Sequence, residues 1–297
     1  MGATPRRNAG LALAATFGLL AACSSPALSH VSARTSVDVA PGNPFRTGHT
    51  LIIPHGGGDG LFPENTIYAY EHSMALGGEV VDIDVSLSAD GVLVAFHDAT
   101  VERTTNGTGA VANMTMAQLA ELDAGWGFER GGDHPFRDKG IGVPTLKQVL
   151  QRFPTTPTTL DVKDERVELA APICALLRDL GRTRDVYIGT DGAAQVVGFR
   201  SACPEVNTSG TDEERKAMRT ARDAGDTAFT TRQLVSQPSY KAADGTIRIT
   251  KAFLDFSHSK GIAVLTWVVD DPKDMAALMA LGVDGIYTRR PDLMIKL

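Results

Sequence analysis

The chain lacks a basic surplus, a low-complexity tract and many aromatic residues. In its 297 residues, 29 Lys and Arg stand against 35 Asp and Glu, a formal net charge of -6. No basic run supplies the electrostatic footprint of a nucleic-acid-binding protein, so we expect no nucleic-acid partner. Aromatic residues make up 6%, while 30 Gly and 15 Pro are spread along the chain. That spread favours regular elements joined by many short connections.

A hydrophobic run long enough to cross a bilayer is also missing from the N-terminus. The apolar run from Gly10 to Ala22 has 13 residues, and a membrane-spanning helix needs about 20. Because Arg6 and Arg7 precede it and small residues follow, the run is typical of a secretory signal. It ends in Leu20-Ala21-Ala22-Cys23, which resembles the lipobox of bacterial lipoproteins, whose cysteine is acylated and becomes the mature N-terminus.

These patterns predict a signal peptide over residues 1–22, a flexible tether over residues 23–46 after a lipidated Cys23, and a folded domain over residues 47–297. We expect an exported protein, lipid-anchored to the outer face of the bacterial cytoplasmic membrane or in the periplasm. An ordinary cleaved signal and an uncleaved helix are the alternatives.

Two cysteines remain in the predicted domain, Cys174 and Cys203. In a compartment that permits disulfides they either pair or stay as buried free thiols. A disulfide would stabilise the fold by roughly 3 kcal/mol in the chain-entropy model. Spacing alone does not decide between the two, because it does not fix the distance between their Cα atoms.

A charged strand is the feature around which the chain is organised. Residues 80–85 are largely β-branched and lead to a turn at Asp90-Gly91, after which residues 92–96 resume a strand pattern. Asp82 and Asp84 stand two residues apart, so their side chains leave the strand on the same face. Such a pair usually holds a cation or shares a proton, because like charges repel and lose hydration. A solvated edge hairpin is the alternative.

Other ionisable residues stand where predicted strands end or helices begin. They are His55, Glu64, His97, Asp161 and Lys163. A lone histidine after a strand is more often structural than catalytic, but here several such groups would share one rim. His55 is followed by Gly56 and Gly57, which open a glycine-rich loop whose backbone N–H groups can approach an anion.

Strands alternate with helices through the rest of the chain, which predicts a parallel sheet. Nine candidate strands are found, including a weak one over residues 227–231, one more than a (β/α)8 barrel needs. Residues 92–96 are the surplus, because the preceding turn is too short for a parallel crossover of about a dozen residues. We therefore expect a TIM-type (β/α)8 barrel with an extra hairpin strand and, over residues 123–142, a long loop.

The gathered groups fit the chemistry of phosphodiester cleavage. Four carboxylates offer only oxygen donors, which suits one divalent cation, Ca²⁺ or Mg²⁺, better than zinc. Two histidines provide a proton acceptor and a proton donor, and a lysine with the metal stabilises phosphoryl charge.

In these residues the chain resembles the glycerophosphodiester phosphodiesterase family. The matching motifs follow the family's order and span residues 50–292: His55, Pro63-Glu64-Asn65-Thr66, Asp82-x-Asp84, Asp90-Gly91, His97-Asp98, Arg103-Thr104-Thr105-Asn106-Gly107, Leu122-Asp123-Ala124-Gly125, Pro144-Thr145-Leu146, Asp161-x-Lys163, Thr266-Trp267 and Gly282-Val283-Asp284-Gly285-Ile286. The resemblance implies a TIM barrel, a divalent cation, and hydrolysis of glycerophosphodiesters to sn-glycerol 3-phosphate and an alcohol.

The resemblance also implies a role for each matching residue. His55 and His97 would be the catalytic acid/base pair. The metal ligands would be Glu64, Asp82, Asp84 and Asp161. Lys163 would be a phosphate contact. To the substrate and phosphate contacts we add Trp267 and, through the amides of their glycine-rich loop, Gly56 and Gly57.

Three departures from the family pattern bear on the substrate. Gly56 stands where the family usually has a phosphate-binding Arg. Asp82 and Asp161 are each one methylene shorter than the usual Glu. Arg289 and Arg290 put basic charge at the last strand end, a candidate receptor for an anionic substrate group.

Two other functions remain open from the sequence. One is phospholipase D-like cleavage of intact phospholipids at the same site. The other is a catalytically inactive barrel that acts as a surface binding protein, which the missing Arg suggests. In the long loop, Trp126 and His134 either contact substrate or only pack the loop, and packing is the favoured interpretation.

Overall fold

The computed structural model describes residues 1–2, 42–164, 166–190 and 192–297. The predicted signal peptide, most of the predicted tether and Cys23 lie outside these residues. The strands are β1 (Leu51–Pro54), β2 (Val81–Leu87), β3 (Leu93–Ala95), β4 (Thr158–Val162), β5 (Val186–Gly189), β6 (Asn207–Thr208), β7 (Val235–Ser236), β8 (Ala263–Thr266) and β9 (Gly285–Thr288). The helices are α1 (Ile67–Leu76), α2 (Met116–Ala120), α3 (Leu146–Arg152), α4 (Ala170–Asp179), α5 (Ala193–Ala202), α6 (Asp212–Asp223), α7 (Lys251–Ser259), α8 (Pro272–Leu281) and α9 (Pro291–Met294).

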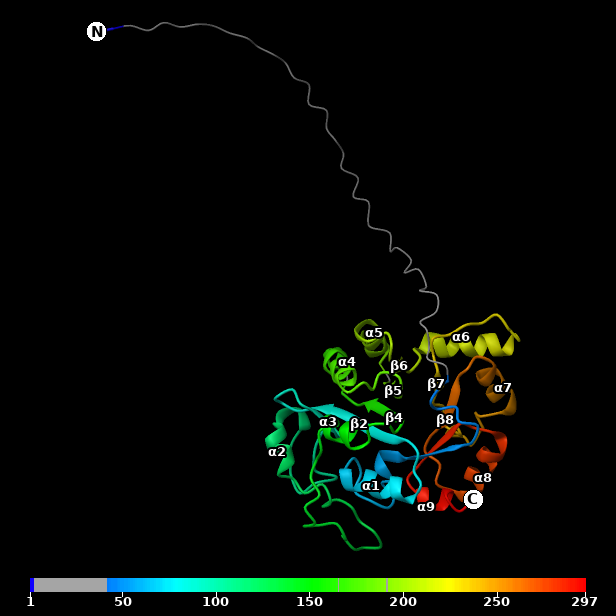
Figure 1. Cartoon of the computed structure of the whole chain (residues 1–297), viewed down its shortest axis with the longest axis horizontal. Coiled ribbons are helices and arrows are strands. Elements are labelled where there is room, and N and C mark those ends of the chain that lie inside the picture. Colours follow the sequence, from blue (N-terminus) through cyan, green and yellow to red (C-terminus); the bar gives the residue numbers. More distant parts are fainter. Residues whose placement is uncertain (3–41, 165, 191) are drawn as a thin grey trace. The chain divides into compact units, whose positions relative to one another are not determined.

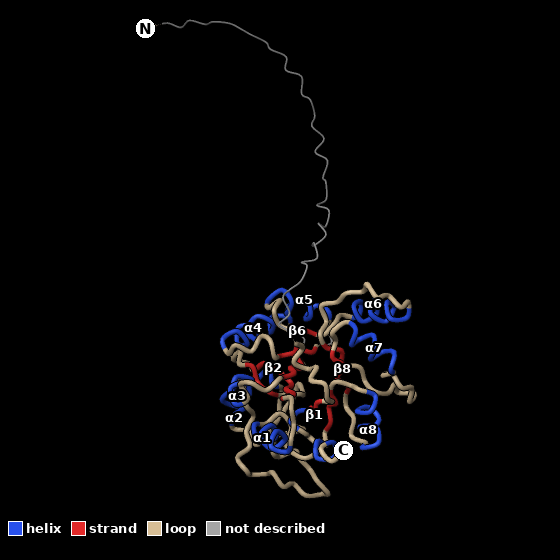
Figure 2. Tube along the Cα trace, turned by 45° about the vertical axis from the view of Figure 1, so that its right-hand side comes forward, coloured by secondary structure: helices blue, strands red, loops and turns tan. Residues whose placement is uncertain are grey.

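The strands gather inside the domain and the helices lie outside them (Figures 1 and 2). Hydrogen-bonded neighbours run in the order β3-β2-β4-β5-β6 in one sheet and β1-β9-β8-β7 in the other. Every pair is parallel except β2 with β3. Among the described residues no ladder joins β1 to β2 or β6 to β7, so the ring of strands has two seams. The (β/α)8 architecture and the surplus role of β3 are thus confirmed.

One predicted strand is wrong. Residues 227–231 form no strand; most of this segment is exposed, and Asp226 Oδ1 accepts a hydrogen bond from the Ala228 amide in a turn. The strand of this part of the chain is β7, which begins at the fully buried Val235. A strand of two residues is too short to show a periodicity in the sequence.

Short polar side chains start several helices. Thr66, Thr145 and Thr211 each accept a hydrogen bond from the backbone of the first helical turn, at the starts of α1, α3 and α6. At Thr145 and Thr211 the third helical residue, Gln148 or Glu214, reaches back to the capping residue's backbone and completes a capping box. These caps fix where each helix starts behind its strand.

The outward face of β2 and β4 is apolar and packs against helices, while the opposite face carries the polar side chains of the site. Val81, Ile83 and Val85 of β2 pack with Leu160 of β4 and with the buried faces of α3 and α4. A disulfide joins Cys174 of α4 to Cys203 after α5, with Cα atoms 5.6 Å apart. The two helices outside β4 and β5 are therefore covalently linked.

The packed domain begins before residue 47, where the sequence placed the end of the tether. Phe45 is fully buried and meets the Tyr187 ring edge-on, with ring centroids 6.4 Å apart. Asn43 Nδ2 donates to the carbonyl oxygens of Leu234 (2.7 Å) and Gly261 (3.1 Å). Residues 43–46 are therefore part of the fold, because they contribute both core area and hydrogen bonds.

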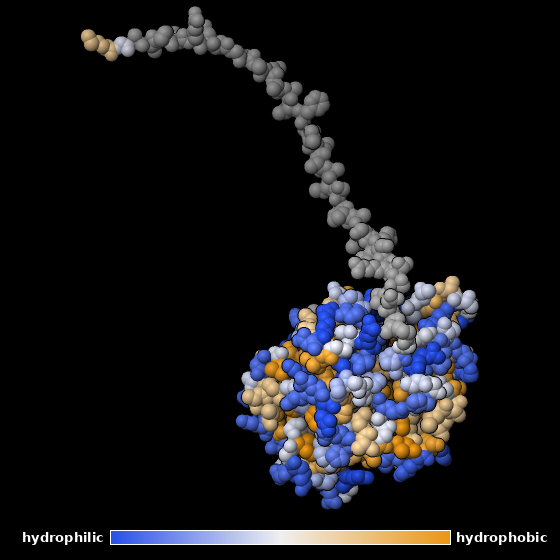
Figure 3. Space-filling view, in the orientation of Figure 1, coloured by the Kyte–Doolittle hydropathy of each residue, from blue (hydrophilic) through white to orange (hydrophobic). Residues whose placement is uncertain are grey.

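On the face of the domain seen in Figure 3, hydrophilic and hydrophobic residues are interspersed. The large apolar side chains that stay exposed in the described residues include Trp267 and Val268, directly after β8. None of the described helices combines the length and apolar character that a membrane span requires.

Candidate active site at the carboxyl ends of the strands

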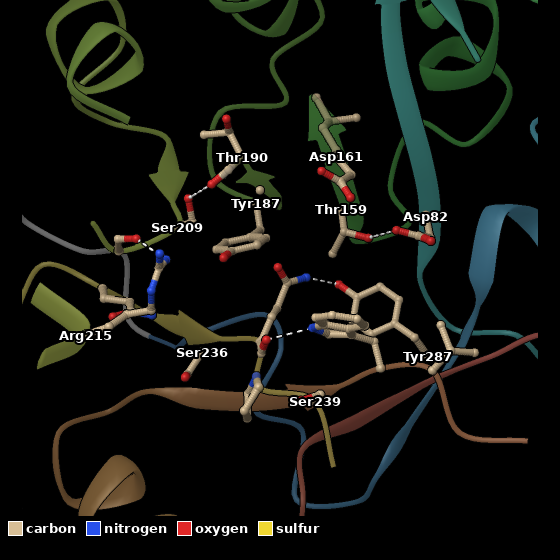
Figure 4. A pocket seen from close by; sticks show the side chains of 18 of the residues that line it. Asp82, Thr159, Asp161, Tyr187, Thr190, Ser209, Arg215, Ser236, Ser239 and Tyr287 are labelled. Carbon is tan, nitrogen blue, oxygen red and sulfur yellow. Dashed lines mark hydrogen bonds between the residues drawn. The ribbon is translucent and has the colours of Figure 1, made fainter. Parts of the chain in front are cut away.

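A cavity of about 960 Å³ opens at the carboxyl ends of the strands (Figure 4). The predicted site residues that line it are His55, Asp82, Asp84, His97, Asp161, Lys163 and Trp267. A smaller cavity of about 220 Å³ is lined by Gly56 and Glu64 and shares three of these residues, His55, Asp84 and His97. The structure thus brings nearly all of the predicted residues to one end of the barrel, where function gathers in this fold.

Asp82 is a buried carboxylate with two hydrogen-bond donors. Its Oδ2 accepts from the Gly56 amide at 3.0 Å, and its Oδ1 accepts from the Thr159 hydroxyl at 2.7 Å. Burial raises the pKa of Asp82 to about 6, and the negative charge of Asp84 adds to that rise while the charge of His55 opposes it. The expected crowding of two like charges on one strand face is therefore present.

Asp84 is held by Asn65 and faces Lys163. Asn65 Nδ2 donates to Asp84 Oδ2 at 2.7 Å, and Asn65 Oδ1 accepts from the Asp84 amide at 3.0 Å and from the Tyr70 hydroxyl at 2.8 Å. Lys163 Nζ lies 3.3 Å from Asp84 Oδ1 and 2.7 Å from Asp161 Oδ2. Burial lowers the pKa of Lys163, but the two carboxylates outweigh burial and raise it, so this lysine stays charged.

His55 begins a 3-10 turn directly after β1, and its Nδ1 lies 3.4 Å from Asp59 Oδ2 four residues on. Burial lowers the pKa of His55, but Asp59, Asp82 and Asp84 outweigh burial and raise it to about 9. Sequence reasoning missed Asp59; the signal was an acidic residue one turn after the strand-end histidine. The ring is therefore protonated at neutral pH in this arrangement.

His97 follows β3, and its Nδ1 lies 2.6 Å from Asp98 Oδ1. Arg103 holds the same carboxylate through Nε (2.5 Å) and reaches both oxygens of Glu64, at 2.6 and 2.7 Å. The hydrogen bond from Arg103 lowers the pKa of Asp98 most. Burial opposes this change, and the hydrogen bond with His97 lowers the pKa further. One guanidinium thus links the rim after β3 to the start of α1.

The four predicted metal ligands do not surround one point. Among the described residues no group of three or more His, Cys, Asp and Glu side chains is arranged to hold an ion. Glu64 faces Arg103, and Asp161, whose side chain is 47% exposed, faces Lys163. The oxygen-only donors and the desolvated Asp82 fit a hard cation chemically, but here Arg103 and Lys163 supply the compensating positive charge.

The predicted phosphate contacts behave differently from one another. The Gly56 amide, expected to face an anion, donates to Asp82. Gly57 has a positive φ of 87° and packs against α1, where an added Cβ would lie 2.8 Å from Ala69 Cβ, so the backbone there requires glycine. Trp267 is 48% exposed at the cavity, and its Nε1 donates to the Gln237 carbonyl at 2.7 Å.

The basic residues after the last strand are already paired. Arg289 Nε lies 2.6 Å from Asp270 Oδ2, and Arg290 Nε lies 2.8 Å from Asp292 Oδ1. Neither arginine lines the two cavities described here. A different set of arginines does line the larger cavity, namely Arg215, Arg219, Arg222 and Arg248, and sequence reasoning missed it.

The long loop over residues 123–142 is irregular, as predicted. The Arg137 guanidinium lies 4.4 Å from the centre of the Trp126 ring, and His134 Nδ1 lies 3.0 Å from the Phe128 carbonyl oxygen. Neither Trp126 nor His134 lines the two cavities, so their contacts match loop packing.

Comparisons with known proteins agree with this geometry. The family model described as the glycerophosphoryl diester phosphodiesterase family matches residues 55–293. A Bacillus subtilis protein named glycerophosphodiester phosphodiesterase is 29% identical over 98% of this chain and 98% of its own length. A Mycobacterium tuberculosis protein named probable glycerophosphodiester phosphodiesterase 1 is 30% identical over 82% of this chain and 90% of its own.

A solved structure shares the fold. The crystal structure of a glycerophosphodiester phosphodiesterase from Agrobacterium tumefaciens has a TM-score of 0.68 and 27% identity, covering 84% of this chain and 100% of its own. Since the family model matches most of the chain from the first site histidine to beyond the last strand, the chain belongs to the glycerophosphoryl diester phosphodiesterase family.

Proposed function

We propose that this protein hydrolyses glycerophosphodiesters to sn-glycerol 3-phosphate and an alcohol, in a reaction that depends on a divalent cation. The observation that carries the proposal is that His55 and His97 line the same cavity together with Asp82, Asp84 and Lys163. Hydrolysis of a diester needs a proton acceptor for the attacking oxygen, a proton donor for the departing one and positive charge beside the phosphoryl oxygens. These residues offer all three.

The two histidines divide the proton transfers. His55 donates a proton to the leaving alkoxide, and Asp59, which lies outside the proposed cation ligands, favours its protonated form. His97 accepts the proton of the attacking oxygen. Because Asp98 forms a hydrogen bond with Nδ1 of His97, the other ring nitrogen of His97, Nε2, accepts this proton. Lys163 contributes a fixed positive charge beside the cavity.

The cation would be held by Glu64, Asp82 and Asp84, with Asp161 on the adjoining strand, once Glu64 and Asp84 exchange their present partners, Arg103 and Lys163, for the ion. Ca²⁺ or Mg²⁺ bound there supplies positive charge to the phosphoryl oxygens. Asp82 and Asp84 are both buried, and burial raises the pKa of Asp82, so a cation beside it would favour the charged carboxylate. Without the ion, Arg103 pairs with Glu64 and Lys163 with Asp84, while the positive charge nearest to Asp82 is His55.

The test is an assay of sn-glycerol 3-phosphate released from glycerophosphoglycerol and glycerophosphocholine. We expect product with Ca²⁺ or Mg²⁺, loss of product after treatment with a chelator, and recovery when either ion is restored. If product still forms after chelation, the reaction does not depend on a divalent cation, and that part of the proposal is wrong. Absence of product with every divalent cation would overturn the proposed reaction.

We further propose that the protein is exported and anchored by lipid on Cys23. The sequence pattern at residues 20–23 motivates this, and the disulfide between Cys174 and Cys203 supports an oxidising compartment. Labelling cells with a fatty-acid analogue should mark the unaltered protein and not Cys23→Ala. Equal labelling of both proteins, or of neither, would contradict the anchor.

A further inference from the structure

Four arginines line the larger cavity. Arg215, Arg219 and Arg222 come from α6, and Arg248 precedes α7; together they are called the basic wall. The three α6 residues stand at i, i+4 and i+7, so their side chains leave one face of the helix. Figure 4 shows Arg215 on the opposite side of the cavity from Asp82. The Arg215 side chain and the Asp82 carboxylate therefore lie across the cavity from each other.

Much of the charge of the basic wall is available to a ligand. Arg219 is exposed and forms no ion pair with any residue that the structure describes. Arg215 pairs with Asp212 at 2.7 Å and Arg222 with Asp223 at 2.8 Å, but these carboxylates are 87% and 68% exposed. Exposed ion pairs contribute little free energy, so an anionic ligand can replace these carboxylates at small cost.

The cavity is larger than a phosphoryl group requires. Its volume of about 960 Å³ stands near the top of the range of about 300–1,000 Å³ for sites that enclose drug-sized ligands. Gln237, Tyr187 and Tyr287, which carry no formal charge at neutral pH, also line it. A diester whose phosphate lies beside the histidines thus has room for an alcohol half that extends toward the basic wall.

We propose that the basic wall is the subsite for the alcohol half of the substrate, and that it selects alcohols carrying a further anionic group, phosphate or carboxylate. The inference rests on the proposed diester chemistry and adds the class of alcohol. Guanidinium groups bind both anions through paired N–H donors. A cationic alcohol such as choline is disfavoured, because it meets like charge at the same wall.

The test uses ligands that differ in the charge of the alcohol half. The alcohol half is neutral in glycerophosphoglycerol and cationic in glycerophosphocholine. It is anionic in glycerophosphoglycerate and in glycerophosphoglycerol that carries a terminal phosphate. Dissociation constants are measured by calorimetry on the full chain carrying His97→Ala, and kcat/KM on the unaltered protein. We expect both anionic ligands to be preferred about tenfold over the neutral one, with a preference that shrinks as ionic strength rises.

Arg219 is the residue to change, because it supports no other described residue. In Arg219→Gln the anionic preference should fall several-fold, and in Arg219→Glu it should reverse toward glycerophosphocholine. Lys216→Gln is the matched control: it removes the same charge from an exposed position of the same helix that does not line the cavity. It should keep the preference of the unaltered protein.

Separate results address the two proposals. Equal binding of neutral and anionic ligands would overturn the basic-wall subsite, as would a preference that survives Arg219→Gln combined with Arg222→Gln. Absence of hydrolysis together with an intact anionic preference in binding would overturn the proposed reaction and leave the subsite standing. Preference for the phosphate arm alone would support the subsite and narrow its ligand to phosphate.

Discussion

The two sides of the cavity differ in how firmly their charges are held. On the carboxylate side each buried charge has fixed partners, such as Gly56 and Thr159 on Asp82, or Asn65 on Asp84. On the basic wall Arg219 has no ionic partner among the described residues. Held groups are suited to chemistry, which requires fixed geometry, while unheld side chains are suited to ligands that vary. This difference fits the two proposals, that reaction takes place at the first side and selection of the alcohol at the second.

The strongest challenge to this division is removal of a histidine. His97→Ala should lower kcat/KM by about 100- to 10,000-fold, because a positioned general acid or base contributes about that much. Steady-state kinetics with glycerophosphoglycerol measures it, and His55→Ala should behave likewise. His72→Ala is the control, since His72 lies exposed on α1 and lines neither cavity. Unchanged rates in both site variants would move the chemistry elsewhere.

Removing the disulfide tests whether the carboxylate side and the basic wall of the cavity both depend on this crosslink. Cys174→Ser should lower the free energy of unfolding by about 3 kcal/mol, because the crosslink no longer restricts the unfolded chain. The closed loop joins two positions 29 residues apart, and neither cysteine lines the cavity. Urea unfolding measures the loss, while kcat/KM of the folded variant should stay within about twofold. A large loss of activity without unfolding would show that the site needs the crosslink.

Asp59 tests whether the charge on His55 is set by its neighbours. Asp59→Asn should lower the pKa of His55 from about 9 toward 6.5, because the side-chain partner that opposes burial is removed. A raised pKa in the fold contributes stability that is fully present below pH 6.5 and lost as pH rises through 9. The stability difference between the unaltered protein and Asp59→Asn should therefore shrink over that interval.

Proton NMR titration of the His55 ring, with urea unfolding at the two ends of the interval, makes the measurement. A His55 pKa that is the same in both proteins would show that the buried aspartates alone determine it. A stability difference that grows with pH would contradict the raised pKa of His55 in the folded protein.

The smallest expected effect concerns the helix that carries the basic wall. Thr211→Ala removes the cap of α6 and should lower the free energy of unfolding by about 1 kcal/mol. The anionic preference should persist in the folded variant, because Arg219 is retained. Thermal unfolding and calorimetry measure the two quantities. A preference lost with the cap would mean that α6 must be held at its first turn for selection to occur.

The barrel could be predicted because strand and helix patterns alternate and the turn at Asp90-Gly91 is too short for a parallel crossover. The convergence of His55 and His97 followed from the same rule, since strand ends of a barrel meet on one rim. The packed domain starts a few residues before the expected boundary at residue 46. Phe45 belongs to the core because it contacts Tyr187, which lies far along the chain, and no local sequence pattern predicts such a contact.

The arrangement of the carboxylates could not be predicted, because the partners that each one takes are set by tertiary packing. Glu64 is engaged by Arg103, 39 residues away in the sequence. The basic wall was missed for a related reason. Arginines at i, i+4 and i+7 on a charged helix match an ordinary solvated face, and only the fold shows that Arg215, Arg219 and Arg222 line a cavity.

The seam between β6 and β7 has a consequence for the lining of the cavity. No described ladder crosses it, so a small separation of the two sheets breaks no interstrand hydrogen bond there. The carboxylates of β2 and β4 belong to one sheet, while Ser236, in β7 of the other, also borders the cavity. At the seam, between Ser209 after β6 and Ser236 in β7, the lining of the cavity is therefore made by side chains and loops and not by paired strands.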